Sequence, residues 1–307
     1  MLKKNILECI GDTPLVELKN IKEKFGLTFN IFAKLERSNP SGSVKDRAAL
    51  FIIKEGIKKG LINEDTVIIE ATSGNTGISL AMICAILKLK CIIAMPENAS
   101  IERRKMMAAY GAEVVLTDKS LGMKGAVDKA NELKLFYKNS FIADQFNNVA
   151  NKLAHINMTA HEIMTDLENK VDVFIAGFGT SGTLIGTSTV LKQELSRVEV
   201  IGVEPLSSPL ITRNEAGPHK IQGIGANFVP TLYDEKLVDR VIDIKDEDSY
   251  EGARLLARIE GIFAGISSGA CLMAAISLDK DMYKDKNVVI VLPDNGERYL
   301  SVDGLFN

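Results

Sequence analysis

The stretch Thr66-Val67-Ile68-Ile69-Glu70-Ala71-Thr72-Ser73-Gly74-Asn75-Thr76-Gly77 joins a short apolar run to a loop of hydroxyl side chains and glycines. The apolar run predicts a buried strand over Thr66–Glu70, and the residues after the loop predict a helix from about 75 to 89. A strand that runs into a helix through a short loop is the repeating unit of α/β proteins. The stretch therefore predicts an α/β fold.

Strand-like and helix-like runs alternate in this way along most of the 307 residues. Short continuous apolar strands between helices predict mostly parallel sheets with helices on both faces. The other predicted strands are Phe29–Leu35, Cys91–Met95, Glu113–Thr117, Val171–Ala176, Glu199–Val203, Val238–Ile244 and Val288–Leu292. The other predicted helices are 45–59, 100–110, a long polar helix at about 149–169, a loop and helix at 177–195, and 248–260.

Two α/β halves are predicted to meet near residues 145–150 and to leave a cleft between them. Ligands of open α/β sheets bind at the carboxyl ends of the strands, so the loops after the strands are where chemistry is expected. The stretch at about 205–235 contains no clear element, and we expect it to be a mobile segment of the active site.

Composition excludes several classes of function. Hydrophobic residues make up 46% of the chain, charged residues 25%, and the net charge is −3. This mixture is typical of a soluble enzyme, and it gives no electrostatic reason to expect nucleic acid or a membrane as a partner. No apolar run approaches the roughly 18 residues that span a bilayer. The first residues do not resemble a signal peptide, so a cytoplasmic location is expected.

The four cysteines and three histidines give no sign of a metal site. Cys9, Cys84, Cys91 and Cys271 have no CxxC spacing, and the apolar surroundings of Cys84 and Cys91 predict buried thiols in a reducing compartment. The histidines are not spaced as metal ligands, so no metal is expected.

Lys45 is the candidate reactive amine. It follows the small-residue turn Pro40-Ser41-Gly42-Ser43-Val44 and begins a predicted helix. The positive end of a helix dipole disfavours a cation there, and the neutral amine is the form that attacks carbonyl groups. The alternative is a surface lysine that pairs with Asp46.

Three glycine-containing loops follow predicted strands or open helices. The loop Thr72–Gly77 could bind a carboxylate with hydroxyl and amide groups, or could simply cap a helix. The loop Gly177–Thr183 could bind a phosphate. It also fits GxGxxG, with Glu204 placed to contact a ribose, so a dinucleotide enzyme is an alternative. The sequence Gly265-Ile266-Ser267-Ser268-Gly269 fits the GxSxG of hydrolases, but no histidine follows Ser267, which excludes that class.

A reactive amine, a carboxylate loop, a phosphate loop and a neutral hydroxyl together suggest pyridoxal phosphate as cofactor. In this order the motifs resemble the cysteine synthase (O-acetylserine sulfhydrylase) and cystathionine β-synthase family of fold-type II pyridoxal-phosphate enzymes. The resemblance covers almost the whole chain. Further matching segments are Ile10–Val16, Met95–Glu97, Glu102–Lys105, Leu121–Ala126, Gln145-Phe146, Ile221–Ala226 and Glu297–Ser301.

The resemblance implies a role for each candidate residue. Lys45 would hold pyridoxal 5'-phosphate as an imine and later move the α-proton. Asn75 would contact the ring hydroxyl, and Ser267 would meet the pyridine nitrogen. The phosphate would bind to Gly179, Thr180, Ser181, Gly182 and Thr183. The substrate would bind to Thr72, Ser73, Gly74, Thr76, Gln145, Gly223 and Asn227.

The resemblance also implies the architecture. The chain would have a fold similar to that of tryptophan synthase β, with two open twisted, mostly parallel α/β domains and the cofactor in the cleft between them. A smaller mobile domain would span 36–147 and carry the substrate carboxylate loop. A larger domain would comprise 1–35 and 148–307 and carry the phosphate loop. Closure of the smaller domain would exclude water from the reaction.

The implied reaction is a ping-pong β-replacement in which the β-substituent of an amino acid leaves and a thiol or sulfide adds. Cysteine synthase is the first expectation. The chain departs from the family at Asn227, where glycine is usual, and at Ala160-His161, where Gly-Pro is common. Asn227 could alter the choice of donor or could face solvent. A lyase that consumes cysteine and releases hydrogen sulfide, forming lanthionine, serine or cystathionine, therefore stays open. A homodimer is expected, and serine acetyltransferase is a candidate partner.

Overall fold

The computed structural model describes residues 2–306, which divide into two compact units. Unit 1 comprises residues 2–10 and Asn39–Asn151, and unit 2 comprises Gly11–Ser38 and residues 152–306. Residues 2–10 were expected with the larger domain; they belong to unit 1, where Leu7 and Ile10 pack into the core. No helix within residues 2–306 is long and apolar enough to cross a membrane.

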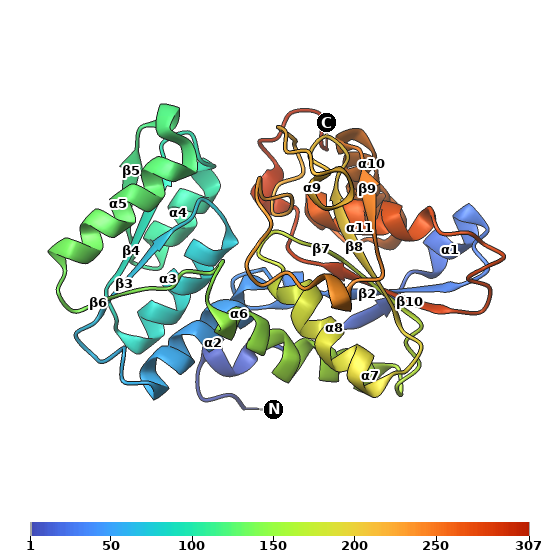
Figure 1. Cartoon of the computed structure of the whole chain (residues 1–307), viewed down its shortest axis with the longest axis horizontal. Helices are drawn as coiled ribbons and strands as arrows, with labels where there is room; N and C mark the ends of the chain where they lie inside the picture. Colours follow the sequence, from blue (N-terminus) through green and yellow to red (C-terminus); the bar gives the residue numbers. More distant parts are fainter. Residues whose placement is uncertain (1, 307) are drawn as a thin grey trace. The chain divides into compact units, whose positions relative to one another are not determined.

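Unit 1 is built on a four-stranded sheet in the order β5-β4-β3-β6, and all three strand pairs are parallel (Figure 1). Its strands are β3 (Val67–Ala71), β4 (Cys91–Pro96), β5 (Glu113–Thr117) and β6 (Ser140–Ile142). Its helices are η1 (Ile6–Cys9), α2 (Lys45–Lys58), α3 (Asn75–Leu87), α4 (Ile101–Ala109), η3 (Lys119–Leu121) and α5 (Gly122–Phe136). Helix α6 (Val149–Ala154) begins in unit 1 and ends in unit 2.

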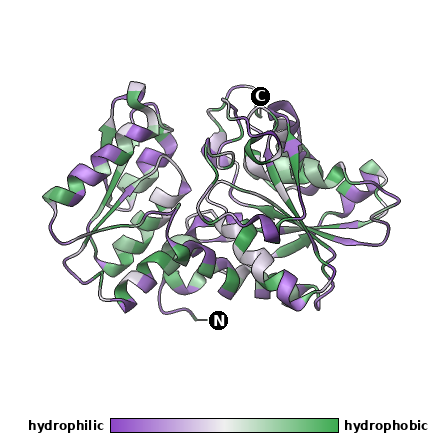
Figure 2. Cartoon of the chain, viewed as in Figure 1, coloured by the Kyte–Doolittle hydropathy of each residue, from purple (hydrophilic) through white to green (hydrophobic). Residues whose placement is uncertain are grey.

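Both faces of the unit 1 sheet are covered, which explains the continuous apolar runs in its strands. Val67 and Ile69 of β3 pack with Ala126 and Ala130 of α5. The intervening Ile68 packs on the opposite side with residues of α2 and α3. Hydrophobic residues accordingly run along the strands in Figure 2. A strand whose two faces are both buried shows no alternation of polar and apolar residues.

Unit 2 contains a six-stranded sheet in the order β1-β2-β10-β7-β8-β9, in which only the β1–β2 pair is antiparallel. Its strands are β1 (Leu15–Glu17), β2 (Asn30–Leu35), β7 (Val173–Gly177), β8 (Glu199–Pro205), β9 (Arg240–Ile244) and β10 (Asn287–Leu292). Its α-helices are α1 (Lys19–Phe25), α7 (Ala160–Asp166), α8 (Gly182–Glu194), α9 (Leu210–Arg213), α10 (Asp246–Glu260) and α11 (Ile266–Ile276). Short helical turns are η2 (Glu36–Ser38), η4 (His155–Thr159), η5 (Glu235–Leu237) and η6 (Glu297–Tyr299).

The α/β class and the mostly parallel sheets are confirmed, but some elements differ from the prediction. The polar helix expected at 149–169 is helical from Val149 to Asp166, but a π-helical turn, η4, interrupts its α-helical hydrogen bonding between α6 and α7. At this turn Gly186 of α8 lies so close that a Cβ would stand 2.5 Å from the carbonyl oxygen of Lys152. The strands and α-helices absent from the prediction are β1, β6, α1, α5, α9 and α11, and α9 lies in the 205–235 stretch where no clear element was expected.

The contact between α10 and α11 depends on two glycines. A Cβ built on Gly252 of α10 would lie 2.3 Å from the backbone carbonyl oxygen of Gly269 in α11, and a Cβ on Gly269 would lie 2.0 Å from the oxygen of Ser249. These neighbours are backbone atoms, so the helices must separate if a side chain is added.

We predict that Gly252→Ala lowers the free energy of unfolding by about 1–3 kcal/mol, the usual cost of overpacking. The control is Glu247→Ala, because Glu247 is exposed in the first turn of the same helix. Urea unfolding of both variants measures the difference. Equal stability of the two variants would contradict the close helix contact.

Candidate active site

Lys45 is the first residue of α2, as predicted, and its side chain is half-buried. The neighbouring Asp46 is fully buried. Its carboxylate accepts hydrogen bonds from the backbone N–H of Ser41 (2.7 Å), from the Ser41 hydroxyl and from the Ser79 hydroxyl (2.6 Å). Asp46 thus ties the turn before Lys45 to helix α3, and this buried position does not fit a surface Lys45–Asp46 pair.

The loop after β3 brings several of the predicted substrate residues together. The Thr76 hydroxyl donates to Oε1 of Gln145 (2.6 Å), and both residues are buried. The Thr72 hydroxyl accepts from the N–H of Gly74 (3.2 Å). Gly74 holds the N-cap position of α3 without any side-chain cap, so the first amide groups of the helix suit an anion. The N-cap position itself is thus held by a residue without a side chain.

Asn75 and Ser73 are half-buried in the same loop, and Asn75 is the first residue of α3. The close contacts of Gly77 explain the glycine at the first turn. A Cβ there would stand 2.6 Å from Cε of Met107 and 3.1 Å from Cγ2 of Thr72. The loop is therefore packed tightly against α4, which restricts its conformation.

Glu70 of β3 was not among the predicted site residues, yet it contacts the site directly. Its side chain is 3% exposed and accepts hydrogen bonds from the backbone N–H groups of Asp144 (2.8 Å) and Gln145 (3.3 Å). Burial raises the pKa of the Glu70 carboxyl from 4.5 to about 7, although the two N–H groups act in the opposite direction.

The predicted phosphate loop lies in unit 2, between β7 and α8. Ser181 precedes the helix with a φ of +67°, a left-handed conformation that few residues other than glycine adopt. Its Oγ is buried and has no hydrogen-bond partner among residues 2–306. At Gly179 a Cβ would lie 2.6 Å from the carbonyl oxygen of Gly223, so the loop at Gly223 closes over it.

Ser267 occupies the first turn of α11 and is buried. A Cβ on Gly223 would stand 3.9 Å from its Oγ, so the structure places Gly179, Gly223 and Ser267 close to one another. Asn227 is exposed on the same connecting segment, and its Oδ1 accepts from the Ser208 hydroxyl at 3.5 Å. Thr180 and Gly182 are buried, and Thr183 is half-buried.

His155 is a second residue that the sequence analysis missed. It is 1% exposed; its Nε2 is 3.2 Å from the hydroxyl of Thr183 and its Nδ1 is 2.9 Å from the hydroxyl of Thr159. The phosphate loop is therefore supported from the π-helical turn. Spacing could not reveal this contact, because 28 residues separate His155 from Thr183.

The dinucleotide alternative required Glu204 to contact a ribose. Glu204 is 1% exposed, and its carboxylate accepts from the backbone N–H groups of Ile211 and Thr212 (both 2.9 Å) and from the Thr212 hydroxyl (2.7 Å). Both carboxylate oxygens therefore accept hydrogen bonds from residues of α9. Glu204 is thus a structural carboxylate, and the alternative loses the residue on which it depended.

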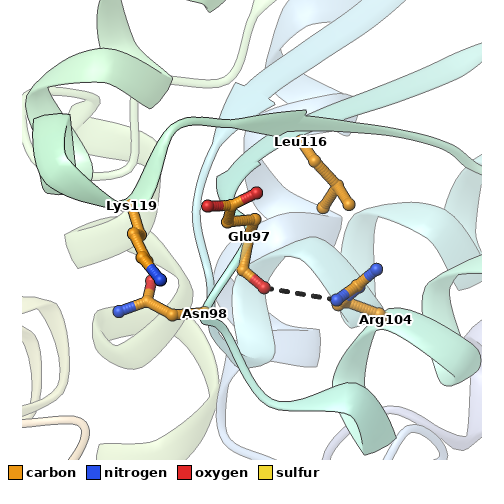
Figure 3. A pocket seen from close by; sticks show the side chains of 5 residues that line it. All are labelled: Glu97, Asn98, Arg104, Leu116 and Lys119. Atoms are coloured by element: carbon orange, nitrogen blue, oxygen red, sulfur yellow. Dashed lines mark hydrogen bonds between the residues drawn. The ribbon is translucent and has the colours of Figure 1, made fainter.

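A shallow pocket of about 470 Å³, whose lining is drawn in Figure 3, contains none of the predicted site residues. It is lined by Glu97, Asn98, Arg104, Leu116 and Lys119, and Nη1 of Arg104 donates to the carbonyl oxygen of Glu97 (3.3 Å). Its mixed charges give no reason to assign it a ligand.

The residues of the phosphate loop fit a phosphate group. An unpartnered buried hydroxyl, the Ser181 turn and the N-terminus of α8 supply donors to an anion. The half-buried amine of Lys45 and the neutral hydroxyl of Ser267 fit the aldehyde and the ring nitrogen of pyridoxal phosphate chemically.

Comparison with known proteins agrees with this assignment. Residues 6–294 match the family model described as "Pyridoxal-phosphate dependent enzyme". The chain is 53% identical over 298 residues to cysteine synthase B of Campylobacter jejuni, covering 97% of both chains.

Solved structures are similar as well. A hydrogen sulfide-producing enzyme from Fusobacterium nucleatum has a TM-score of 0.94 and 48% identity, covering 98% of this chain and 99% of that one. A cysteine synthase from Entamoeba histolytica has a TM-score of 0.95 and 42% identity, covering 99% and 90%.

The raised pKa of Glu70 predicts a particular pH dependence of stability. The folded chain binds this proton more tightly than the unfolded chain, whose carboxyl has a pKa of 4.5. The stabilisation is therefore complete below pH 4.5 and is lost as the pH rises through about 7. It amounts to ~3 kcal/mol.

Glu70→Gln should remove this part of the pH dependence. Urea unfolding at several pH values between about 5 and 8 measures it. We expect the stability of the unaltered chain to fall relative to that of the variant as the pH rises. If the stability of both proteins changes with pH in the same way, burial does not raise the pKa of the Glu70 carboxyl.

Proposed function

Because the chain belongs to the family of pyridoxal-phosphate-dependent enzymes, we propose that it catalyses β-replacement on an L-amino acid. The leading reaction is that of a cysteine synthase, in which O-acetyl-L-serine and sulfide give L-cysteine and acetate. The observation that supports this proposal most is the buried Thr76–Gln145 pair beside the N-terminus of α3, because this cluster suits the carboxylate of an amino acid.

We propose that the cofactor is held by residues from the predicted loops. Lys45 would bind it covalently, Asn75 would contact its ring hydroxyl, and Ser267 would contact its ring nitrogen. The phosphate would accept hydrogen bonds from Gly179, Thr180, Ser181, Gly182 and Thr183. When bound, pyridoxal phosphate withdraws electrons from Cα of the amino acid and makes the α-proton acidic.

The remaining chemistry would come from side chains. The hydroxyls of Thr72, Ser73 and Thr76, with the amide of Gln145, would fix the substrate carboxylate and so orient the α-proton toward Nζ of Lys45. Lys45 would then take that proton as a general base. Ser267 carries no charge, so it would stabilise a protonated ring nitrogen less than a carboxylate would.

A second candidate reaction consumes cysteine and releases hydrogen sulfide. It is favoured by the similar structure of a hydrogen sulfide-producing enzyme and by Asn227, which stands exposed where cysteine synthases usually have glycine. An amide at this position could contact the substrate and change which β-substituent is accepted.

The resemblance supports three finer proposals. The chain would work in the cytoplasm, it would form a homodimer, and its substrates would be small amino acids with thiols or sulfide. Serine acetyltransferase is a proposed partner.

Replacing Lys45 tests the catalytic assignment. We expect Lys45→Ala to lower kcat for β-replacement by about 10²–10⁴-fold, the usual contribution of a general base, while the cofactor still binds through its phosphate. Lys54→Ala, an exposed lysine of the same helix, should leave kcat unchanged. Full activity of Lys45→Ala would refute the assignment.

Replacing Asn227 tests the choice of donor. The unaltered chain is assayed for cysteine formation from O-acetylserine and sulfide, and for sulfide release from cysteine. Asn227→Gly should raise the ratio of kcat/KM for O-acetylserine to kcat/KM for cysteine by about tenfold, the value of one hydrogen bond. Asn214→Gly is the control, since Asn214 is exposed in the same segment with a φ of +57°. Equal ratios in both variants would dismiss Asn227 as a determinant.

A further inference from the structure

We propose that Glu70 is a positioning residue that holds Gln145 in place to bind the substrate carboxylate, an inference that rests on the proposed function. Glu70 itself lies one residue before the end of β3 and is buried, so it is not offered as a group that touches substrate. Its effect would pass through the backbone of residues 144 and 145.

The first step of the argument is the end of the β3–β6 ladder. The last paired residues are Ile69 and Ile142, and the N–H of Ala143 still donates to the carbonyl oxygen of Ile69 (3.1 Å). Beyond that point the strands no longer pair. The next two N–H groups, of Asp144 and Gln145, donate to the Glu70 carboxylate instead. The Glu70 side chain thus accepts the two hydrogen bonds that backbone carbonyl oxygens would accept if the two strands were longer.

The second step is the strain of the segment that Glu70 holds. Asp144 has a φ of +51°, in the left-handed region that non-glycine residues rarely occupy. Such a conformation persists only where surrounding contacts impose it. The segment is further fixed because the carbonyl oxygen of Gln145 accepts from Nδ2 of Asn151 (2.9 Å) and its Oε1 accepts from Thr76 (2.6 Å). Loss of the Glu70 contacts would release one side of Gln145.

The third step is the cost of placing a carboxylate here. Within residues 2–306 no basic side chain forms an ion pair with Glu70, and the rest of β3 is Val67, Ile68, Ile69 and Ala71. A buried, unpaired acid costs stability that an apolar residue in the same strand would not. Its retention at this point is explained by the two N–H groups that it accepts from.

The surroundings make Glu70 sensitive to pH. The charge of Asp144 lies on the held segment, and the thiol of Cys91 faces it from β4. A hydrogen bond with Cys84 and burial raise the pKa of Cys91, so that thiol stays neutral. Helix α5 packs against Val67 and Ile69, on the opposite face of the sheet, so its residues do not face Glu70. A proton on Glu70 removes one acceptor oxygen, so the held segment should loosen as the pH falls below about 7.

The test compares Glu70→Gln with Thr66→Val. The amide of Gln presents a donor where the carboxylate presents an acceptor, so it cannot accept from both N–H groups. Thr66 is buried at the opposite end of the same strand region and bonds to Asn63 and Asn139, so its loss measures a purely structural defect in the same unit.

We expect Glu70→Gln to raise KM for the amino-acid donor about tenfold with kcat changed less than twofold, the result of losing uniform binding. In the unaltered enzyme KM should rise as the pH falls below about 7. In Glu70→Gln this rise of KM at low pH should be absent. Thr66→Val should keep both the KM of the unaltered enzyme and its rise at low pH. If the kinetics of Glu70→Gln match those of Thr66→Val, the proposal is overturned.

Hydrogen exchange gives a readout independent of catalysis. The amides of Asp144 and Gln145 should lose protection in Glu70→Gln and keep it in Thr66→Val. If neither donor reacts with the unaltered chain but this loss is seen, the proposed function fails while the positioning role stands. If Glu70→Gln does not fold, the pH dependence of KM in the unaltered enzyme decides, and a KM that is constant across pH 7 refutes the role.

Discussion

At the carboxyl ends of β3 and β7 the backbone leaves a paired strand and enters a helix within a few residues, and the candidate site depends on this constraint. Amide groups at these points have left one hydrogen-bonding pattern and not yet entered the next. They must be satisfied by side chains or by a ligand. Thr72 and Ser181 stand at these two junctions, and the residues around them are the ones that suit a carboxylate and a phosphate.

Three buried carboxylates, of Asp46, Glu70 and Glu204, accept hydrogen bonds from loop amides. Asp46 accepts from the turn before Lys45, Glu70 from the segment of Gln145, and Glu204 from the first residues of α9. Each fixes a loop that carries or borders a candidate group. For Glu70 this has a cost, because the ionised form that best accepts the two N–H groups is the form that burial disfavours. Stability and positioning therefore change in opposite directions with pH.

The sequence predicted the elements whose signals are local. Continuous apolar runs located β3, β4 and β7, and the small-residue turn located the start of α2 at Lys45. Helix α11 escaped prediction because its first residues form the motif Gly265–Gly269, which resembles a loop until its packing against α10 is known.

The supporting residues of the site were beyond sequence reasoning for a physical reason. In the sequence Glu70 is merely the end of an apolar strand. Its carboxylate accepts a hydrogen bond from the N–H of Gln145, which lies 75 residues later in the chain. His155 depends in the same way on Thr183. Residues that contact a ligand form compact motifs, whereas residues that hold those motifs are chosen by the tertiary fold.

The measurement that tests the account most directly is reduction of the cofactor-loaded protein with borohydride, followed by digestion and mass spectrometry. Reduction makes the bond between a lysine amine and the aldehyde of pyridoxal phosphate permanent. We predict that the added mass lies on the peptide containing Lys45 and on no other lysine. Modification of a different lysine, or a bound cofactor without any modified lysine, would contradict the assignment on which the proposed reaction rests.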